Sequence, residues 1–137
     1  MTREEVNQIY YIDREIEMWK RQLLDIRAGG KIKAQIITGM PHANTNMTTD
    51  PTGEEVQRIE EIEVIIQSKL CQIQAQKKKV YAYIATLDDS LMRQIIMHRC
   101  ITLCSWQEVA MYVGGGNTAD SVRKRFERHF EEEKNTA

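Results

Sequence analysis

The chain of 137 residues has few of the residues that interrupt helices or cross-link secreted domains. Only two prolines occur, and the three cysteines are an odd number without the spacing of a disulfide framework. Isoleucine, glutamate, glutamine and lysine are abundant instead, which favours helices and argues against a β-sandwich. We therefore expect an all-α protein whose cysteines stay reduced inside a cell.

Long hydrophobic runs are also missing from the chain. No uncharged apolar stretch approaches the length of about 20 residues that a membrane-spanning helix needs. The chain passes from Met1 straight into the sequence TREEV, without the basic region and apolar core of a secretory signal. We expect a cytoplasmic protein without a membrane partner.

An excess of positive charge is absent too, since 19 Lys and Arg face 20 Asp and Glu. A self-sufficient nucleic-acid-binding domain is usually basic. Here residues 117–130 hold a local group of basic residues against two acidic ones: Arg123, Lys124, Arg125 and Arg128 against Asp120 and Glu127. This footprint is one helix wide, so non-specific DNA binding should be weak and sensitive to salt. Binding would need two copies of the motif or a second protein on the DNA.

No catalytic motif is present. The chain lacks G-x-S-x-G, the phosphate-binding G-x-x-x-x-G-K and the zinc motif H-E-x-x-H. Gly114–Gly116 precedes a predicted helix but follows another helix, whereas a nucleotide-binding loop follows a strand. His98, Cys100 and Cys104 lack a fourth ligand at zinc-like spacing. We expect no enzymatic activity, no cofactor and no metal site.

The first long helix is predicted over residues 2–28. Thr2 and Glu5 form a T-x-x-E capping box, and Gly29-Gly30 ends the helix. Apolar residues then recur at heptad spacing, on a face formed by Ile9, Ile12, Ile16, Trp19, Leu23 and Ile26. This spacing predicts a coiled-coil-like seam with charged residues on the other faces.

A second long helix is predicted over residues 51–85, with Asp50 as its cap and Pro51 as its first residue. Its apolar face comprises Val56, Ile59, Ile62, Ile66, Leu70, Ile73, Val80 and Ile84. The segment between the helices, near residues 29–50, is predicted to be a long loop. The two seams pair either with each other, as an antiparallel hairpin over residues 1–86, or each with another subunit, for example in a homodimer.

The remaining residues, 87–137, are predicted to form a three-helix module. Asp88 or Asp89 caps a helix through Leu91, Ile95, Ile96 and Cys100. A core is expected in which Leu91, Ile95, Ile101 and Leu103 pack against Trp106, Val113, Val122 and Phe126. In the next helix a capping box joins Ser105 and Glu108, and Trp106, Val109, Ala110 and Val113 share its inner face.

The glycine run at Gly114–Gly116 ends that helix, and Asn117 or Thr118 caps the last one. Two short helices joined by a glycine turn, with an inward Ala110 and a basic second helix, indicate a helix-turn-helix whose second helix enters the major groove. The residues expected nearest the bases are Thr118, Ala119, Asp120, Ser121, Arg123 and Lys124, and Arg128 is expected to reach a phosphate. The alternative is a plain helical hairpin whose charges are only solvated.

Residues 87–130 resemble region 4 of bacterial sigma factors, in the form found in small phage regulators of the RinA/ArpU kind. The likeness lies in LDDSLMRQIIMHRCI, SWQEVA and NTADSVRKRFERHF. It implies an all-helical regulator of phage or prophage late genes in the bacterial cytoplasm, with double-stranded DNA and host RNA polymerase as partners. One departure is that the interval from Ala110 to Val122 is longer than in the usual motif, which leaves the angle between the two helices open.

A second function class is a helical phage assembly or DNA-packaging protein, similar to a small terminase subunit, in which the motif grips DNA or is structural. The order of parts favours a regulator, because small terminase subunits usually place the DNA-binding helices before the oligomerisation helix. A ring of many copies would support packaging, whereas a monomer or dimer would support transcription.

Overall fold

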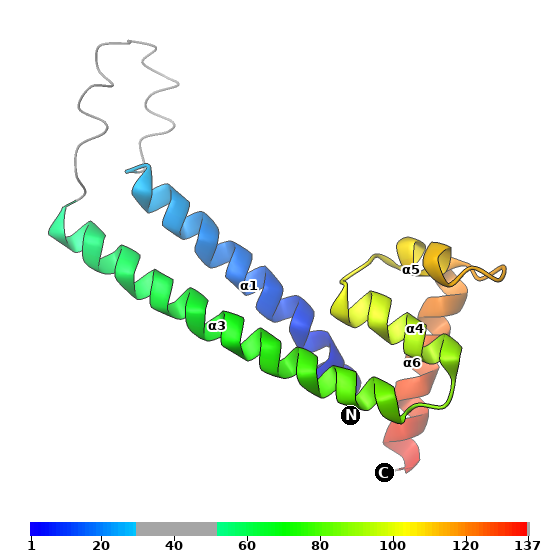
Figure 1. Ribbon diagram of the computed structural model, residues 1–137. Helices are drawn as coiled ribbons and strands as arrows, with labels where there is room; N and C mark the ends of the chain where they lie inside the picture. Colours follow the sequence, from blue (N-terminus) through cyan, green and yellow to red (C-terminus); the bar gives the residue numbers. More distant parts are fainter. Residues whose placement is uncertain (30–51, 137) are drawn as a thin grey trace, which may run out of the picture. The chain divides into compact units, whose positions relative to one another are not determined.

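The computed structural model describes residues 1–29 and 52–136. Their secondary structure is helical throughout and comprises α1 (Arg3–Arg27), α3 (Gly53–Thr86), α4 (Ser90–Ile96), the π-helix η2 (Met97–Ile101), α5 (Trp106–Val113) and α6 (Ala119–Thr136) (Figure 1). The expected all-α class is confirmed for these residues. The loop predicted near residues 29–50 lies almost wholly outside the described residues.

A threonine directly precedes each of the two long helices. Thr2 Oγ1 accepts a hydrogen bond from Glu5 N at 3.2 Å, and Glu5 Oε2 accepts one from Thr2 N at 2.9 Å, which completes the predicted capping box. At the start of α3, Thr52 Oγ1 accepts from Glu55 N at 3.2 Å. This helix therefore begins slightly later than predicted, and Asp50 and Pro51 lie outside the described residues.

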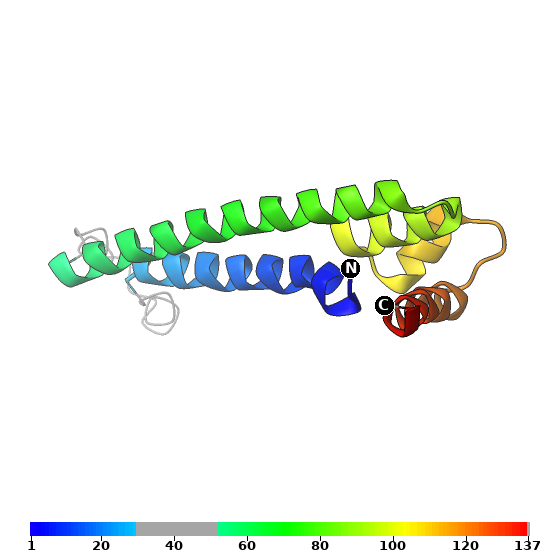
Figure 2. The same cartoon turned by 90° about the horizontal axis from the view of Figure 1, so that it is seen from below.

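The chain forms two compact units, one of residues 14–71 and one of residues 1–13 together with 72–137. Segments of α1 and α3 contribute to both. Within each unit the two segments lie side by side and run antiparallel (Figure 1 and Figure 2). The predicted pairing of the two seams within one chain is therefore confirmed. The predicted domain boundary between residues 86 and 87 stays a prediction.

In the unit of residues 14–71 an ion pair joins Lys69 Nζ to Glu15 Oε1 at 3.4 Å, and Arg27 pairs with Glu63. Its seam is buried at Ile16, Ile62 and Ile66 and half-buried at Trp19, Leu23, Ile26 and Ile59. Two predicted seam residues are not covered, since Val56 and Leu70 are 40 % and 36 % exposed. A single neighbouring helix covers only a narrow stripe of α3, and these two residues lie at its edge.

The other unit has the larger core. Its α1 and α3 segments bury Val6, Ile9, Ile12, Ile73, Val80 and Ile84, and the predicted three-helix module buries Met92, Ile95, Ile96, Cys100, Ile101, Cys104, Val109, Ala110, Val122, Phe126 and Phe130. Four residues predicted for the core are only half-buried: Leu91, Leu103, Trp106 and Val113. Leu103 has a φ of 61°, a left-handed conformation that leucine seldom adopts, as the chain leaves the π-helix for α5.

Burial also determines the protonation state of two cysteines in this core. Burial raises the pKa of the Cys100 thiol to about 12, and burial together with Glu108 raises the pKa of Cys104. Both side chains are therefore thiols at neutral pH and act as small apolar residues. Within residues 1–29 and 52–136, no three His, Cys, Asp or Glu side chains are placed to share a metal ion.

Candidate nucleic-acid interface

Helix α5 begins at the predicted capping box. Ser105 Oγ accepts from Glu108 N at 3.2 Å, and Glu108 Oε1 accepts from Ser105 N at 3.2 Å. Val109 and Ala110 are buried, so the inward face of α5 is the one predicted. The box fixes where this helix starts, and the spacing of its apolar residues fixes which face packs against the core.

Trp106 fixes the orientation of α5 against its neighbours. Its ring meets Phe126 of α6 edge to face, with centroids 5.3 Å apart. The Arg99 guanidinium lies over the same ring, 4.3 Å from its centroid, and Arg99 Nη1 donates to the Cys104 carbonyl at 2.9 Å. This half-buried tryptophan therefore ties η2, α5 and α6 together through cation–π and aromatic contacts.

The turn between α5 and α6 consists of three glycines in a row with positive φ: 62° at Gly114, 64° at Gly115 and 77° at Gly116. Gly114 N donates to the Ala110 carbonyl at 3.0 Å and so closes α5. The Gly114 carbonyl then accepts from Asn117 N at 3.2 Å and from Asn117 Nδ2 at 2.8 Å. The residues that lengthen the motif therefore form a compact hydrogen-bonded turn, and Asn117 closes it rather than capping α6.

Gly114 should be the least replaceable of these glycines. Its ψ of −146° combines with a φ of 62° in a region that is essentially restricted to glycine. A Cβ at this position meets no heavy atom within 4 Å, so only backbone strain opposes a side chain. We expect Gly114→Ala to lower the free energy of unfolding by about 1–3 kcal/mol, as measured by urea denaturation. The control Gly53→Ala, in the first turn of α3 with equally open surroundings, should not destabilise, and equal losses would contradict the argument.

Helix α6 is capped by Thr118, one of the two candidates that the sequence offered. Thr118 Oγ1 accepts from Ser121 N at 3.1 Å, and Ser121 Oγ accepts from Thr118 N at 2.9 Å. Ser121 Oγ also donates to the Thr118 carbonyl at 2.9 Å. Both hydroxyls predicted to lie near the bases are therefore engaged in fixing the start of the helix, with Ala119 half-buried beside them.

Asp120, Arg123 and Lys124 form one connected group on the first turns of α6. Asp120 Oδ1 accepts from Arg123 Nη2 at 2.7 Å, and Asp120 Oδ2 lies 3.0 Å from Lys124 Nζ. Arg123 Nη1 also donates to Glu127, at 3.2 Å and 3.4 Å from its two carboxylate oxygens. Hydrogen bonds from Lys124 and Arg123 hold the pKa of Asp120 below its usual value, so this carboxylate is charged at neutral pH.

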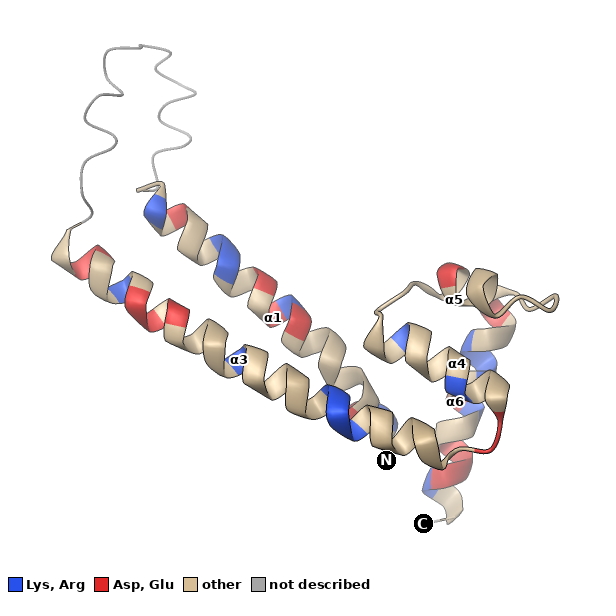
Figure 3. Ribbon diagram, viewed as in Figure 1, with Lys and Arg blue, Asp and Glu red and all other residues tan. Residues whose placement is uncertain are grey.

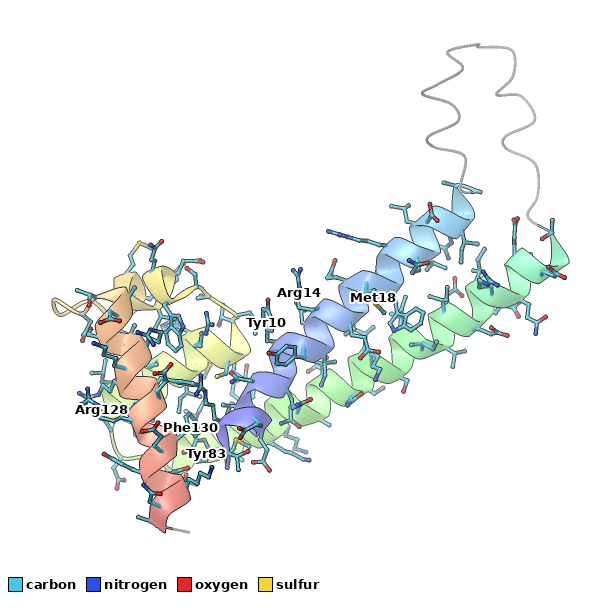
Figure 4. All side chains as sticks on the ribbon, turned by 180° about the vertical axis from the view of Figure 1, so that it is seen from behind. Tyr10, Arg14, Met18, Tyr83, Arg128 and Phe130 are labelled. Carbon is cyan, nitrogen blue, oxygen red and sulfur yellow. The ribbon has the colours of Figure 1, made fainter. Side chains whose placement is uncertain are left out.

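Arg125 and Arg128, the other two basic residues predicted for this surface, are in different situations. Arg125 Nη2 donates to Asp89 Oδ2 at 3.1 Å, while Asp89 Oδ1 caps α4 by accepting from Leu91 N at 3.0 Å. Hydrogen bonding to Arg125 lowers the pKa of Asp89. Arg128 is exposed and makes no hydrogen bond or ion pair within the described part of the chain. Figure 4 shows it on the side of α6 away from Tyr83 and Phe130.

The charge pattern of α6 is therefore mixed rather than purely basic. Figure 3 shows Lys and Arg interspersed with Asp and Glu along this helix. Of the predicted site residues, Asp120, Arg123 and Lys124 lie together, and Thr118 and Ser121 form the cap. Arg128 stands apart and has no partner among residues 1–29 and 52–136. Arg128 can therefore meet an anionic surface directly, whereas Arg123, Lys124 and Arg125 must first exchange a carboxylate partner for it.

Comparison of the chain with protein-family models, curated proteins and solved structures finds no match.

One polar cluster of this unit was not predicted. The Tyr83 hydroxyl of α3 lies 2.6 Å from His129 Nε2 and donates to Glu133 Oε1 at 2.6 Å, both on α6. Burial and the neighbouring Glu133 raise the pKa of Tyr83, so its hydroxyl stays protonated. No motif in the sequence joins Tyr83 to His129, which lies 46 residues away. The cluster holds the later turns of α6 against the end of α3.

Proposed function

We propose that this chain binds double-stranded DNA through α5 and α6 and acts as a transcriptional regulator. One observation carries the proposal: α5 and α6 are two capped helices whose inward faces are buried, while the first turns of α6 carry the half-buried Arg123 and the exposed Lys124 on the outer side. This is the arrangement in which a second helix lies in a major groove and α5 supports it from behind.

The carboxylates that pair with the basic residues indicate that DNA binding is weak without a specific sequence and selective for one. Among the four basic residues of 117–130, Arg123, Lys124 and Arg125 each have an acidic partner, and Arg128 has none among the described residues. Few phosphates can then be neutralised without the loss of an internal ion pair, so non-specific affinity is low and contacts to base edges must contribute.

The finer proposal draws on the resemblance of residues 87–130 to sigma region 4. On this basis the protein is a phage or prophage regulator that acts at late-gene promoters in a bacterial cytoplasm, with host RNA polymerase as a candidate partner. Within residues 1–29 and 52–136, no helix combines the length and hydropathy that a bilayer-spanning segment requires.

The test is a fluorescence anisotropy titration of the full chain against a mixed-sequence duplex and against duplexes from the neighbouring genomic region, repeated across salt. We expect tighter binding to one native duplex, with a shallow dependence on salt that corresponds to only a few phosphates. If no duplex binds at low salt, the proposal fails and α5–α6 would be a protein-contact module.

A further inference from the structure

The unit of residues 14–71 exposes more large apolar side chains than it buries, among its described residues. Only Ile16, Ile62 and Ile66 are buried. The exposed ones are Met18 at 47 %, Leu24 at 65 %, Val56 at 40 %, Val64 at 68 % and Leu70 at 36 %. Helices in proteins gain most of their stability by packing an apolar face. Two helices that share so small a core leave an exposed apolar surface, which is typical of a site that binds another protein chain.

A groove of about 690 Å³ runs between α1 and α3 in this unit. Its lining includes the buried Ile66 and the half-buried Leu23. Lys20 on α1 and Glu60 and Val64 on α3 are exposed along it. The groove is therefore apolar at its centre and carries opposite charges on the two helices that form it.

Most of the exposed apolar residues belong to the face that contains this groove. Leu24 follows the groove residue Lys20 by one helical turn, and Val56 and Leu70 lie one heptad before and after the groove residue Glu63. Met18 is different, since two residues correspond to about 200° around a helix and place it on the far side from Lys20.

The charges of this unit suit a second copy of the same chain. The described α1 segment, residues 14–29, has four Lys or Arg against three Asp or Glu, whereas the α3 segment, residues 52–71, has two against five. Glu60 makes no ion pair among the described residues, and Lys20 pairs only with Glu17 of its own helix, at 3.8 Å. The first segment is thus net positive and the second net negative.

We propose that two copies of the chain dock groove to groove through this face and form a four-helix bundle. A two-fold axis would place α1 of one copy against α3 of the other, so that Lys20 faces Glu60 twice and the two Val64 side chains close the centre. Every helix would then have neighbours of the opposite net charge. The dimer does not depend on DNA binding by α6, although it would present two copies of α6 to two half-sites.

The test is sedimentation equilibrium of the full chain and its variants over a wide concentration range. We expect wild type to reach twice the chain mass of 16.0 kDa. Val64→Glu would bury unpaired carboxylates at the two-fold axis and should weaken the dimer by about a hundredfold or more, with helical circular dichroism retained. The matched control is Met18→Glu, which adds the same charge on the far side of α1 and should leave the dimer intact.

If Val64→Glu fails to fold, a swap of the charges at Lys20 and Glu60 still tests the proposed dimer. Lys20→Glu alone should weaken the dimer about tenfold, because it sets like charges opposite each other, and adding Glu60→Lys should restore it. A wild type that stays monomeric, a ring of many copies, or a dimer that Val64→Glu leaves unchanged would each overturn the proposal.

Discussion

Replacement of Phe126 by alanine is expected to destabilise the unit that carries α4, α5 and α6 by about 3–5 kcal/mol. Phe126 is 2 % exposed and meets Trp106 and Phe130 edge to face, with ring centroids 5.3 Å and 4.9 Å away. Its removal deletes a buried ring, leaves a cavity and breaks both aromatic pairs. Because a domain is typically stable by only about 5–15 kcal/mol, this loss is a large fraction of the unit's stability.

The two tryptophans allow this loss to be measured in one unit at a time. Trp106 belongs to the unit of Phe126 and Trp19 to the unit of residues 14–71. In a Trp19→Phe background, urea denaturation followed by Trp106 fluorescence therefore reports the unit that contains Phe126. The control is Tyr112→Ala, which removes a 57 % exposed ring stacked on His98 and should cost far less. A loss below about 1 kcal/mol for Phe126→Ala would contradict a central role for this ring.

Features that depend on neighbours in sequence could be predicted. The boxes at Thr2–Glu5 and Ser105–Glu108 require only residues three apart, and the structure contains both. The period of apolar residues likewise identified the inward face of α6, including Phe126. A capping box or a helical face follows from local geometry, so the sequence alone is enough to locate it.

Features that join distant residues could not be predicted in this way. The ion pair of Arg125 with Asp89 spans 36 residues and the bond of Tyr83 with His129 spans 46. The sequence also could not show that Val56 and Leu70 remain partly exposed, because heptad spacing indicates that a partner exists without identifying it. In the candidate interface the basic residues were predicted from the sequence. Their ion pairs with Asp120 and Glu127 were not predicted.

Loss of either basic residue on the first turns of α6 is expected to weaken duplex binding without loss of helicity. A base-edge contact is worth about 1–3 kcal/mol, which corresponds to a loss of affinity of about 5- to 150-fold. Arg123→Ala should cost more than Lys124→Ala, because it leaves Glu127 without its Arg123 contact and Asp120 with Lys124 alone. The measurement is anisotropy with the native duplex, alongside circular dichroism.

The control for these variants is Lys134→Ala, which removes the same charge from the last turn of α6. It should change affinity little, since Lys134 lies far along the helix from the turns expected to meet the bases. Unchanged binding in both Arg123→Ala and Lys124→Ala would remove these residues from the reading face. A base contact should also relax sequence preference, whereas a phosphate contact should weaken all duplexes alike.

The opposite change, Asp120→Asn, is expected to strengthen binding to every duplex. The carboxylate pairs with both Arg123 and Lys124, so its neutralisation frees Lys124, leaves Arg123 with Glu127 alone, and removes a negative charge from the surface that would face DNA. The slope of affinity against salt should steepen by up to about one phosphate contact, while Glu131→Gln on the same helix should leave it unchanged. Weaker binding confined to the native duplex would instead mean that Asp120 accepts a hydrogen bond from a base, as a carboxylate can from cytosine. The direction in which Asp120→Asn changes the affinity for DNA therefore shows whether Asp120 acts as a counter-ion for Arg123 and Lys124 or contacts a base.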